Sequence, residues 1–191
     1  MFRMKLNLSI LSVSALALCP SISLAQESGP ASASTAAVQE AFGTKMDFND
    51  KTDFEDARKG LIAEFTDGVI RDAAGKVVWD MKSYAFENSE KAPPTVNPSL
   101  WRQERLNTIA GLFKVTEGIY QVRGLDLSNM TIIEGKSGLI VVDPLVSMET
   151  ASAAMTLYRK HVGQRPVKAV IYSHSHVDHY GGVNSALTKS V

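Results

Sequence analysis

The sequence predicts an α/β fold, the first half of an αββα sandwich preceded by an N-terminal extension. Two observations predict this class. From residue 113 onward, short β-branched runs alternate with glycines, as strands joined by tight turns do. An amphipathic helical pattern over residues 147–161 then lies between two apolar runs, residues 139–142 and 167–172. The order strand, helix, strand opens such a sandwich.

The composition is that of an ordinary globular protein. Hydrophobic residues make up 45% of the chain, charged residues make up 21%, and the formal net charge is zero. The sequence shows neither a basic stripe nor an aromatic platform. We therefore expect no nucleic-acid partner.

Residues 1–25 are expected to be a signal peptide. Arg3 and Lys5 precede an apolar run from Leu6 to Leu18, and small residues at Ser23 and Ala25 suit cleavage after Ala25. The apolar run is too short for a membrane span, so we expect no stable membrane anchor; an uncleaved anchor is the alternative. Export to the periplasm or secretion follows from this interpretation.

Residues 26–112 are expected to form a lead-in and N-terminal extension. Gln26 to Thr44 has the polar, alanine-rich composition of a flexible segment. Thr52 and Glu55 form a capping-box pattern that predicts a helix from Asp53 to Ala63. Residues 68–70 and 76–79 flank Ala73-Ala74-Gly75 and predict a hairpin.

A proline-rich stretch, residues 92–98, excludes helix before Ser99, which is expected to cap the next helix. The residues of that helix expected to face the core are Leu100, Leu106, Ile109 and Leu112. Arg102 and Arg105 on the same segment are suited to hold a carboxylate or sulfate. A solvated or salt-bridged face is the favoured interpretation for each.

Four strands are expected in the C-terminal half, at residues 113–116, 119–123, 131–134 and 139–142. The last is almost wholly apolar, as a strand covered on both faces would be. Ser147 is expected to cap a helix through His161, and His161 suits the helix end as a cation rather than as a ligand. The residues expected on the buried face are Met148, Ala151, Met155, Tyr158 and Val162.

The densest chemical signal is the stretch from Ser173 to Gly182, which holds three of the four histidines in the pattern H-x-H-x-D-H-x-G-G. It follows residues 167–172, which are expected to form a buried strand. Imidazole is the commonest metal ligand, and His174 and His176 project to the same side of an extended loop. Asp178 and His179 can turn toward a second metal. Gly181 and Gly182 allow a sharp turn into a helix beside the site.

Asp143 ends the strand at residues 139–142. It either forms a plain Asp-Pro turn with Pro144 or, as the family resemblance described next implies, supports the metal loop.

The decamer is the metal signature of the metallo-β-lactamase superfamily, and the chain resembles that superfamily here. Further segments look like the alkyl sulfatases, zinc-dependent enzymes that hydrolyse alkyl sulfates such as dodecyl sulfate, often in the periplasm. These segments are residues 96–103, 111–124, 126–131, 143–146 and 165–172. The resemblance identifies residues 113–191 as the N-terminal part of a metallo-β-lactamase-like domain.

The resemblance implies two zinc ions that activate water and offset the charge of the sulfate ester. By resemblance His174 and His176 bind one ion, Asp178 and His179 bind the other, and Asp178 orients the attacking water. Asp143, Gly181 and Gly182 support the loop. It also implies a small-molecule alkyl sulfate substrate and, for full-length family members, a homodimer.

The resemblance also implies that family members continue well past the metal loop. We therefore expect the chain to be an N-terminal fragment without activity of its own. Three functions remain open: an alkyl sulfatase, another hydrolase of the superfamily such as a lactamase or thioesterase, or a non-catalytic remnant.

Overall fold

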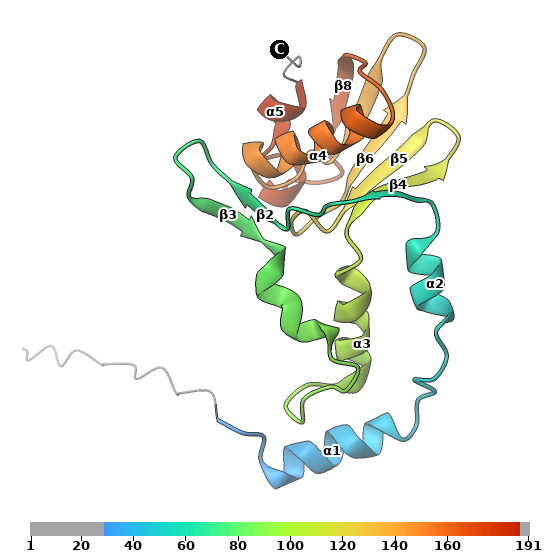
Figure 1. The fold of residues 1–191 in the computed structure, drawn as a ribbon, viewed down its shortest axis with the longest axis vertical. Helices are drawn as coiled ribbons and strands as arrows, with labels where there is room; N and C mark the ends of the chain where they lie inside the picture. The colour runs from blue at the N-terminus through green and yellow to red at the C-terminus, as the bar shows by residue number, and fades with distance from the viewer. Residues whose placement is uncertain (1–28, 188–191) are drawn as a thin grey trace, which may run out of the picture.

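The computed structural model describes residues 29–187, so the expected signal peptide lies outside the described residues. Figure 1 shows a sheet with two helices packed on it at one end of the molecule and further helices at the other end. The helices are α1 (Ala33–Gly43), α2 (Thr52–Arg58), α3 (Pro98–Asn107), α4 (Met148–His161) and α5 (Val183–Leu187), with 3-10 turns η1 (Met81–Asn88) and η2 (Val177–His179). Among residues 29–187, no helix is both long and apolar enough to cross a membrane.

The main sheet has six strands in the order β1-β4-β5-β6-β7-β8. Its strands are β1 (Leu61–Glu64), β4 (Gly111–Thr116), β5 (Ile119–Arg123), β6 (Met130–Glu134), β7 (Leu139–Val142) and β8 (Val167–Ile171). All neighbours are antiparallel except β7 and β8, which run parallel and are joined by α4. The strands predicted at residues 113–142 are confirmed, and so is the α/β class.

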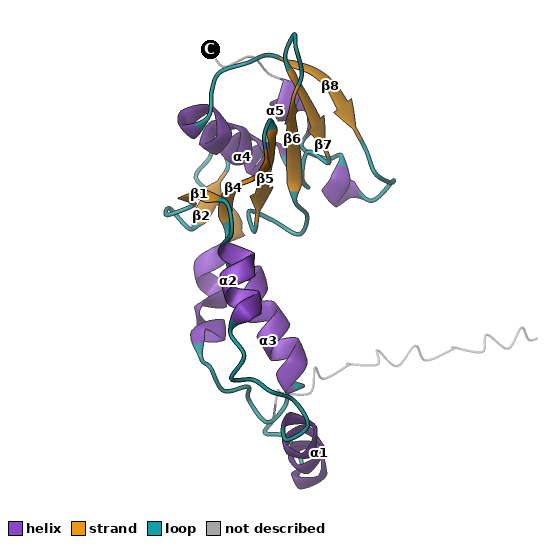
Figure 2. Ribbon diagram, turned by 90° about the vertical axis from the view of Figure 1, so that its right-hand side faces the viewer, coloured by secondary structure: helices purple, strands orange, loops and turns teal. Residues whose placement is uncertain are grey.

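Helix α4 packs against the sheet and closes the core, as Figure 2 shows. Ser147 caps it, with its side chain accepting from the Thr150 N–H, which confirms the predicted cap. Ala151, Met155 and Tyr158 are fully buried, whereas Met148 is 49% exposed and so was wrongly assigned to the buried face. Met148 is the first residue of the helix and lines a surface pocket beside β2.

The two last strands are less enclosed than the sequence predicted. In β7 fully buried residues alternate with half-buried ones, so only the face toward α4 is completely covered. The segment 167–172 was expected to be buried, but Ile171 is 50% exposed and Tyr172 is 48% exposed. The reason is position, because β8 is the edge strand of the sheet.

The N-terminal half contains the predicted hairpin, with β2 (Val69–Arg71) paired to β3 (Val77–Asp80). Two other predictions there were wrong. The supposed flexible segment contains α1, which Ser32 caps by accepting from the Thr35 N–H. Helix α2 ends at Arg58 instead of Ala63, because Gly60 turns with φ +76° and the next residues pair with β4 as β1.

The helix starts also differ from the predicted caps. Lys51, not Thr52, precedes α2 and makes no side-chain cap. Asn97 caps α3 with its side-chain oxygen, so the helix begins at Pro98, a position proline tolerates. Helix α3 buries Trp101 and leaves Leu100 54% exposed, while Leu112 belongs to β4. Trp101 thus takes the place predicted for Leu100, while the predicted Leu106 is half-buried and Ile109 lies past the helix end.

Candidate metal centre

The histidine-rich loop connects β8 to α5 and lies beside the end of β7. Because β7 and β8 are parallel, with Val142 opposite Ile171, their carboxyl ends meet at one edge of the sheet. The Asp143 N–H donates to the Ile171 carbonyl at 3.0 Å, which extends the pairing one residue further. This edge is where α/β proteins commonly hold ligands.

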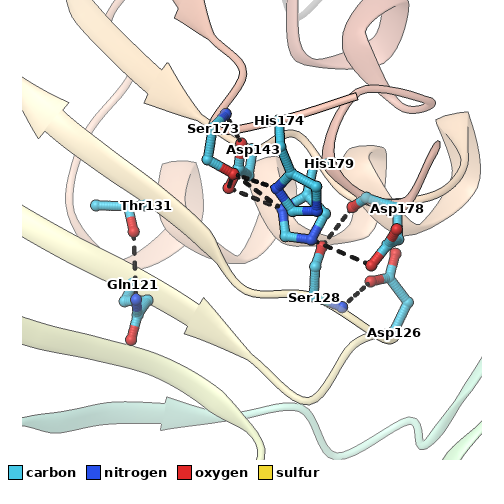
Figure 3. Close-up of polar contacts among 9 residues, drawn as sticks. All are labelled: Gln121, Asp126, Ser128, Thr131, Asp143, Ser173, His174, Asp178 and His179. Carbon is cyan, nitrogen blue, oxygen red and sulfur yellow. Dashed lines mark hydrogen bonds and ion pairs between the residues drawn. The ribbon is translucent and has the colours of Figure 1, made fainter. Parts of the chain in front are cut away.

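Asp143 holds the loop in place, as Figure 3 shows. Its Oδ1 accepts from the Ser173 N–H at 2.7 Å, and its Oδ2 accepts from the Ser173 hydroxyl at 2.7 Å. The Nδ1 atom of His179 lies 2.8 Å from the same Oδ2. Of the two interpretations of Asp143, these contacts favour support of the loop over a plain turn.

The environment of Asp143 keeps its carboxylate ionised. Burial alone would raise the pKa of Asp143, but hydrogen bonds from Ser173 and His179 outweigh it and hold the pKa below the ordinary value. The backbone of Asp143 is left-handed, with φ 54°, a conformation that costs energy for a residue other than glycine. The turn after β7 is thus shaped to aim this carboxylate at the loop.

The three histidines of the loop lie together. The ring of His174 is centred 4.0 Å from that of His179 and 4.6 Å from that of His176. His174 and His176 are exposed, whereas the side chain of His179 is 20% exposed. His161, the fourth histidine, lies at the far end of α4, in agreement with its prediction as a helix-end residue.

The contact between His179 and Asp178 suggests a cation site. With Asp143 accepting from Nδ1–H, the Nε2 atom of His179 carries its lone pair. That atom faces Asp178 Oδ2 at 3.2 Å. Two electron-rich atoms at this distance repel each other unless a proton or a metal ion lies between or beside them. The contact therefore fits either a proton shared by the two side chains or a metal ion bound by both.

The fit is partial. Among residues 29–187, no three His, Cys, Asp or Glu side chains converge as a complete metal-ligand set. The loop offers four donors, three imidazoles and one carboxylate, whereas zinc sites use three or four protein ligands per ion. Two ions would need further ligands besides those of this loop.

A second buried carboxylate, Asp126, was not singled out by sequence reasoning. Its Oδ1 accepts from the Ser128 N–H at 2.9 Å. Its Oδ2 accepts from the Val146 N–H at 2.9 Å and from the Thr150 hydroxyl at 2.7 Å. The Ser128 hydroxyl in turn donates to the main-chain oxygen of Asp178. Asp126 thus connects the β5–β6 loop, the start of α4 and the metal loop.

Gly181 and Gly182 are required by close packing rather than by a left-handed turn. A Cβ on Gly181 would lie 2.1 Å from the Val146 carbonyl oxygen, and one on Gly182 would lie 2.2 Å from that of Pro144. The Gly182 N–H also donates to the Leu145 carbonyl at 3.0 Å. The glycines let the metal loop lie directly on the β7–α4 turn, and α5 begins immediately after them.

Comparison with protein families gives one match of direct relevance. Residues 123–189 match the model of the metallo-beta-lactamase superfamily. The matched range includes Asp143 and the whole metal loop.

Curated proteins with extended similarity include two sulfatases. A linear primary-alkylsulfatase from Pseudomonas sp. is 52% identical over 167 residues, which are 87% of this chain and 25% of that protein. The alkyl/aryl-sulfatase BDS1 of Saccharomyces cerevisiae is 53% identical over 146 residues, 76% of this chain and 23% of that protein. The chain therefore spans about a quarter of the length of these relatives.

A solved structure has the same fold. The stereoselective inverting sec-alkylsulfatase Pisa1 from Pseudomonas sp. superposes with a TM-score of 0.78 at 54% identity. The superposition covers 85% of this chain and 25% of that one.

Proposed function

Because the chain belongs to the metallo-β-lactamase superfamily and matches the N-terminal portion of its alkylsulfatases, we propose that it forms part of a zinc-dependent enzyme that hydrolyses alkyl sulfate esters to alcohol and sulfate. The observation that carries the metal dependence is the contact of Asp143 with His179. The substrate class rests on the names of the relatives.

We assign the ligands as the resemblance implies. His174 and His176 hold one zinc ion, and Asp178 and His179 hold the other. Zinc suits imidazole and carboxylate donors. Bound there, the ions would supply positive charge for the sulfate ester and make water acidic enough to react near neutral pH.

Side chains around the metal loop orient the candidate ligands. Asp143 fixes the ring plane and tautomer of His179, so that Nε2 is the nitrogen offered to the metal. The Ser173 hydroxyl donates to Asp143, and its oxygen lies 2.9 Å from Nδ1 of His174. Because Asp143 also contacts His179, Ser173 connects His174 to His179 through this carboxylate. Ser128 holds the main chain of Asp178 while leaving its carboxylate available.

The activity is tested on the whole gene product with dodecyl sulfate, zinc and an assay for free sulfate. We expect sulfate release that a chelator abolishes and that His176→Ala reduces by at least a hundredfold. His161→Ala is the matched control, since it removes an exposed histidine at the far end of α4, and it should leave the rate unchanged. Cleavage of a β-lactam without sulfate release would favour another hydrolase of the superfamily.

We also propose that the protein is exported and cleaved after Ala25. The order of basic, apolar and small residues at the N-terminus supports this. Mass spectrometry of the periplasmic fraction should find a mature protein that begins at Gln26. A periplasmic form that still begins at Met1 would refute cleavage.

A further inference from the structure

A cavity lies between α1, the proline-rich segment and α3. Its volume is about 450 Å³, within the ~300–1,000 Å³ of small-molecule sites. The apolar part of its wall includes Phe48, Phe54, Pro93, Val96 and Trp101. In Figures 1 and 2, α1 lies at the opposite end of the molecule from β8, so the cavity is remote from the metal loop.

Two arginines line this cavity, and only one has an anionic partner. Both guanidinium groups lie 5.1 Å from the centre of the Phe54 ring. Arg102 is paired with Asp53 and donates to the Asp50 carbonyl at 2.9 Å. Arg105 is half-buried, and among residues 29–187 no carboxylate pairs with it. Of the predicted solvated or salt-bridged face, the salt bridge is confirmed for Arg102.

The half-buried guanidinium group of Arg105 lacks a carboxylate partner among residues 29–187, so it can still bind an anion. It offers five N–H donors in a planar fork, and its central carbon lies over the Phe54 ring in a cation–π contact. A sulfate or carboxylate would satisfy it with two parallel hydrogen bonds.

The charges around the cavity favour an anion. Lys51 lies 3.9 Å from Glu90, so these two largely cancel. The charged residues that line the cavity are Lys51, Lys91, Arg102, Arg105, Glu40 and Glu90. With Arg102 paired to Asp53 and Lys51 to Glu90, two cations, Lys91 and Arg105, remain against one acid, Glu40, and this excess of one attracts a negatively charged ligand.

Gln39 adds a second polar group to the cavity. Its Oε1 atom is buried and has no hydrogen-bond partner among the described residues. Because the oxygen and nitrogen of an amide are interchangeable by rotation, the side chain can present an N–H donor at this position instead. A ligand with acceptor oxygens would satisfy it.

We propose that this cavity binds a single-chain amphiphile with an anionic head group, with the head on Arg105 and the alkyl chain against the aromatic and proline residues. The site is a binding site without chemistry of its own, and it goes beyond the hydrolysis proposed for the metal loop. An alkyl sulfate and a fatty acid share the required chemistry.

Calorimetric titration of the purified chain tests the site. The ligands are decyl sulfate, decanoate and uncharged decanol, below the concentration of micelle formation and in EDTA so that metal plays no part. We expect both anions to bind with one-to-one stoichiometry and decanol to bind at least tenfold more weakly. A preference between the two anions identifies sulfate or carboxylate as the natural head group.

Arg105→Gln should weaken anion binding about tenfold and leave decanol binding unchanged. Arg58→Gln removes an exposed arginine of α2 outside the cavity and is the matched control. Anion affinity that is equal in the parent and Arg105→Gln, or decanol binding as tight as that of decyl sulfate, would overturn the proposal. Loss of the near-ultraviolet circular dichroism on titration would also overturn it, because binding would then be detergent unfolding.

Discussion

Two buried carboxylates, Asp126 and Asp143, support the metal loop in different ways. Asp143 contacts the loop directly, through Ser173 and the ring of His179. Asp126 contacts hydroxyl and backbone groups: it reaches the loop through Ser128, and it binds Val146 in the β7–α4 turn on which the loop lies. The same chemical group therefore orients a candidate ligand in one place and assembles the scaffold in the other.

This comparison predicts the largest loss of stability at Asp126. Asp126→Ala would leave the Ser128 N–H, the Val146 N–H and the Thr150 hydroxyl without their acceptor, so we expect a loss of about 3–4 kcal/mol in unfolding free energy. Urea denaturation measures it. Asp67→Ala, at an exposed loop position, should change stability by less than about 0.5 kcal/mol. A loss at Asp126 as small as that at Asp67 would refute the scaffold role.

Gly182 tests the contact between the metal loop and the scaffold. In Gly182→Ala the new methyl group would lie 2.5 Å from Ala151 Cβ as well as against backbone oxygens, so we expect a loss of about 2–3 kcal/mol. Gly163→Ala is the control, because nothing lies within 4 Å of its Cβ position. Equal melting temperatures for the two variants would show that the loop does not pack as described.

Asp143 should matter more for metal than for folding. Asp143→Asn keeps the size of the side chain but removes the charge that holds His179, so we expect zinc affinity to fall about 10–100-fold. Competition with a chromophoric chelator measures the affinity. Zinc affinity that falls more in Asp126→Asn than in Asp143→Asn would reverse the assigned roles.

Ser128 connects Asp126 to the main chain of Asp178 and should give the smallest effect. Ser128→Ala removes the hydrogen bond to the Asp178 main chain, at a cost of about 1 kcal/mol in unfolding free energy. Its zinc affinity should fall less than that of Asp143→Asn, because no ligand side chain loses its partner. A larger fall would mean that the loop backbone, rather than the ring of His179, limits metal binding.

The sequence was sufficient to predict features whose signals are local. The strands from residue 113 onward are punctuated by glycines, and the ligand candidates lie within six positions. Asp143 had two interpretations, a turn from its place before Pro144 and a supporting role from the family resemblance. Runs of β-branched residues predicted the strands between residues 113 and 142.

The missed features depend on distant partners. Asp126 lies 20 residues before Val146, and Ser128 lies 50 residues before Asp178, so no local pattern marks them. Strand β1 forms because it pairs with β4, which overrides the helical preference of residues 61–63. The polar segment that became α1 has a composition that suits both a helix and a flexible chain.

The most direct test of the metal centre is nuclear magnetic resonance of the histidine rings during zinc titration. Long-range nitrogen–proton spectra distinguish the two ring nitrogens. We predict that His179 keeps its proton on Nδ1, toward Asp143, while the Nε2 resonance shifts on zinc binding together with those of His174 and His176. His161 should not shift. If the rings of His174, His176 and His179 are unaffected by zinc, or if His179 binds it through Nδ1, the account of Asp143 and the metal loop is wrong.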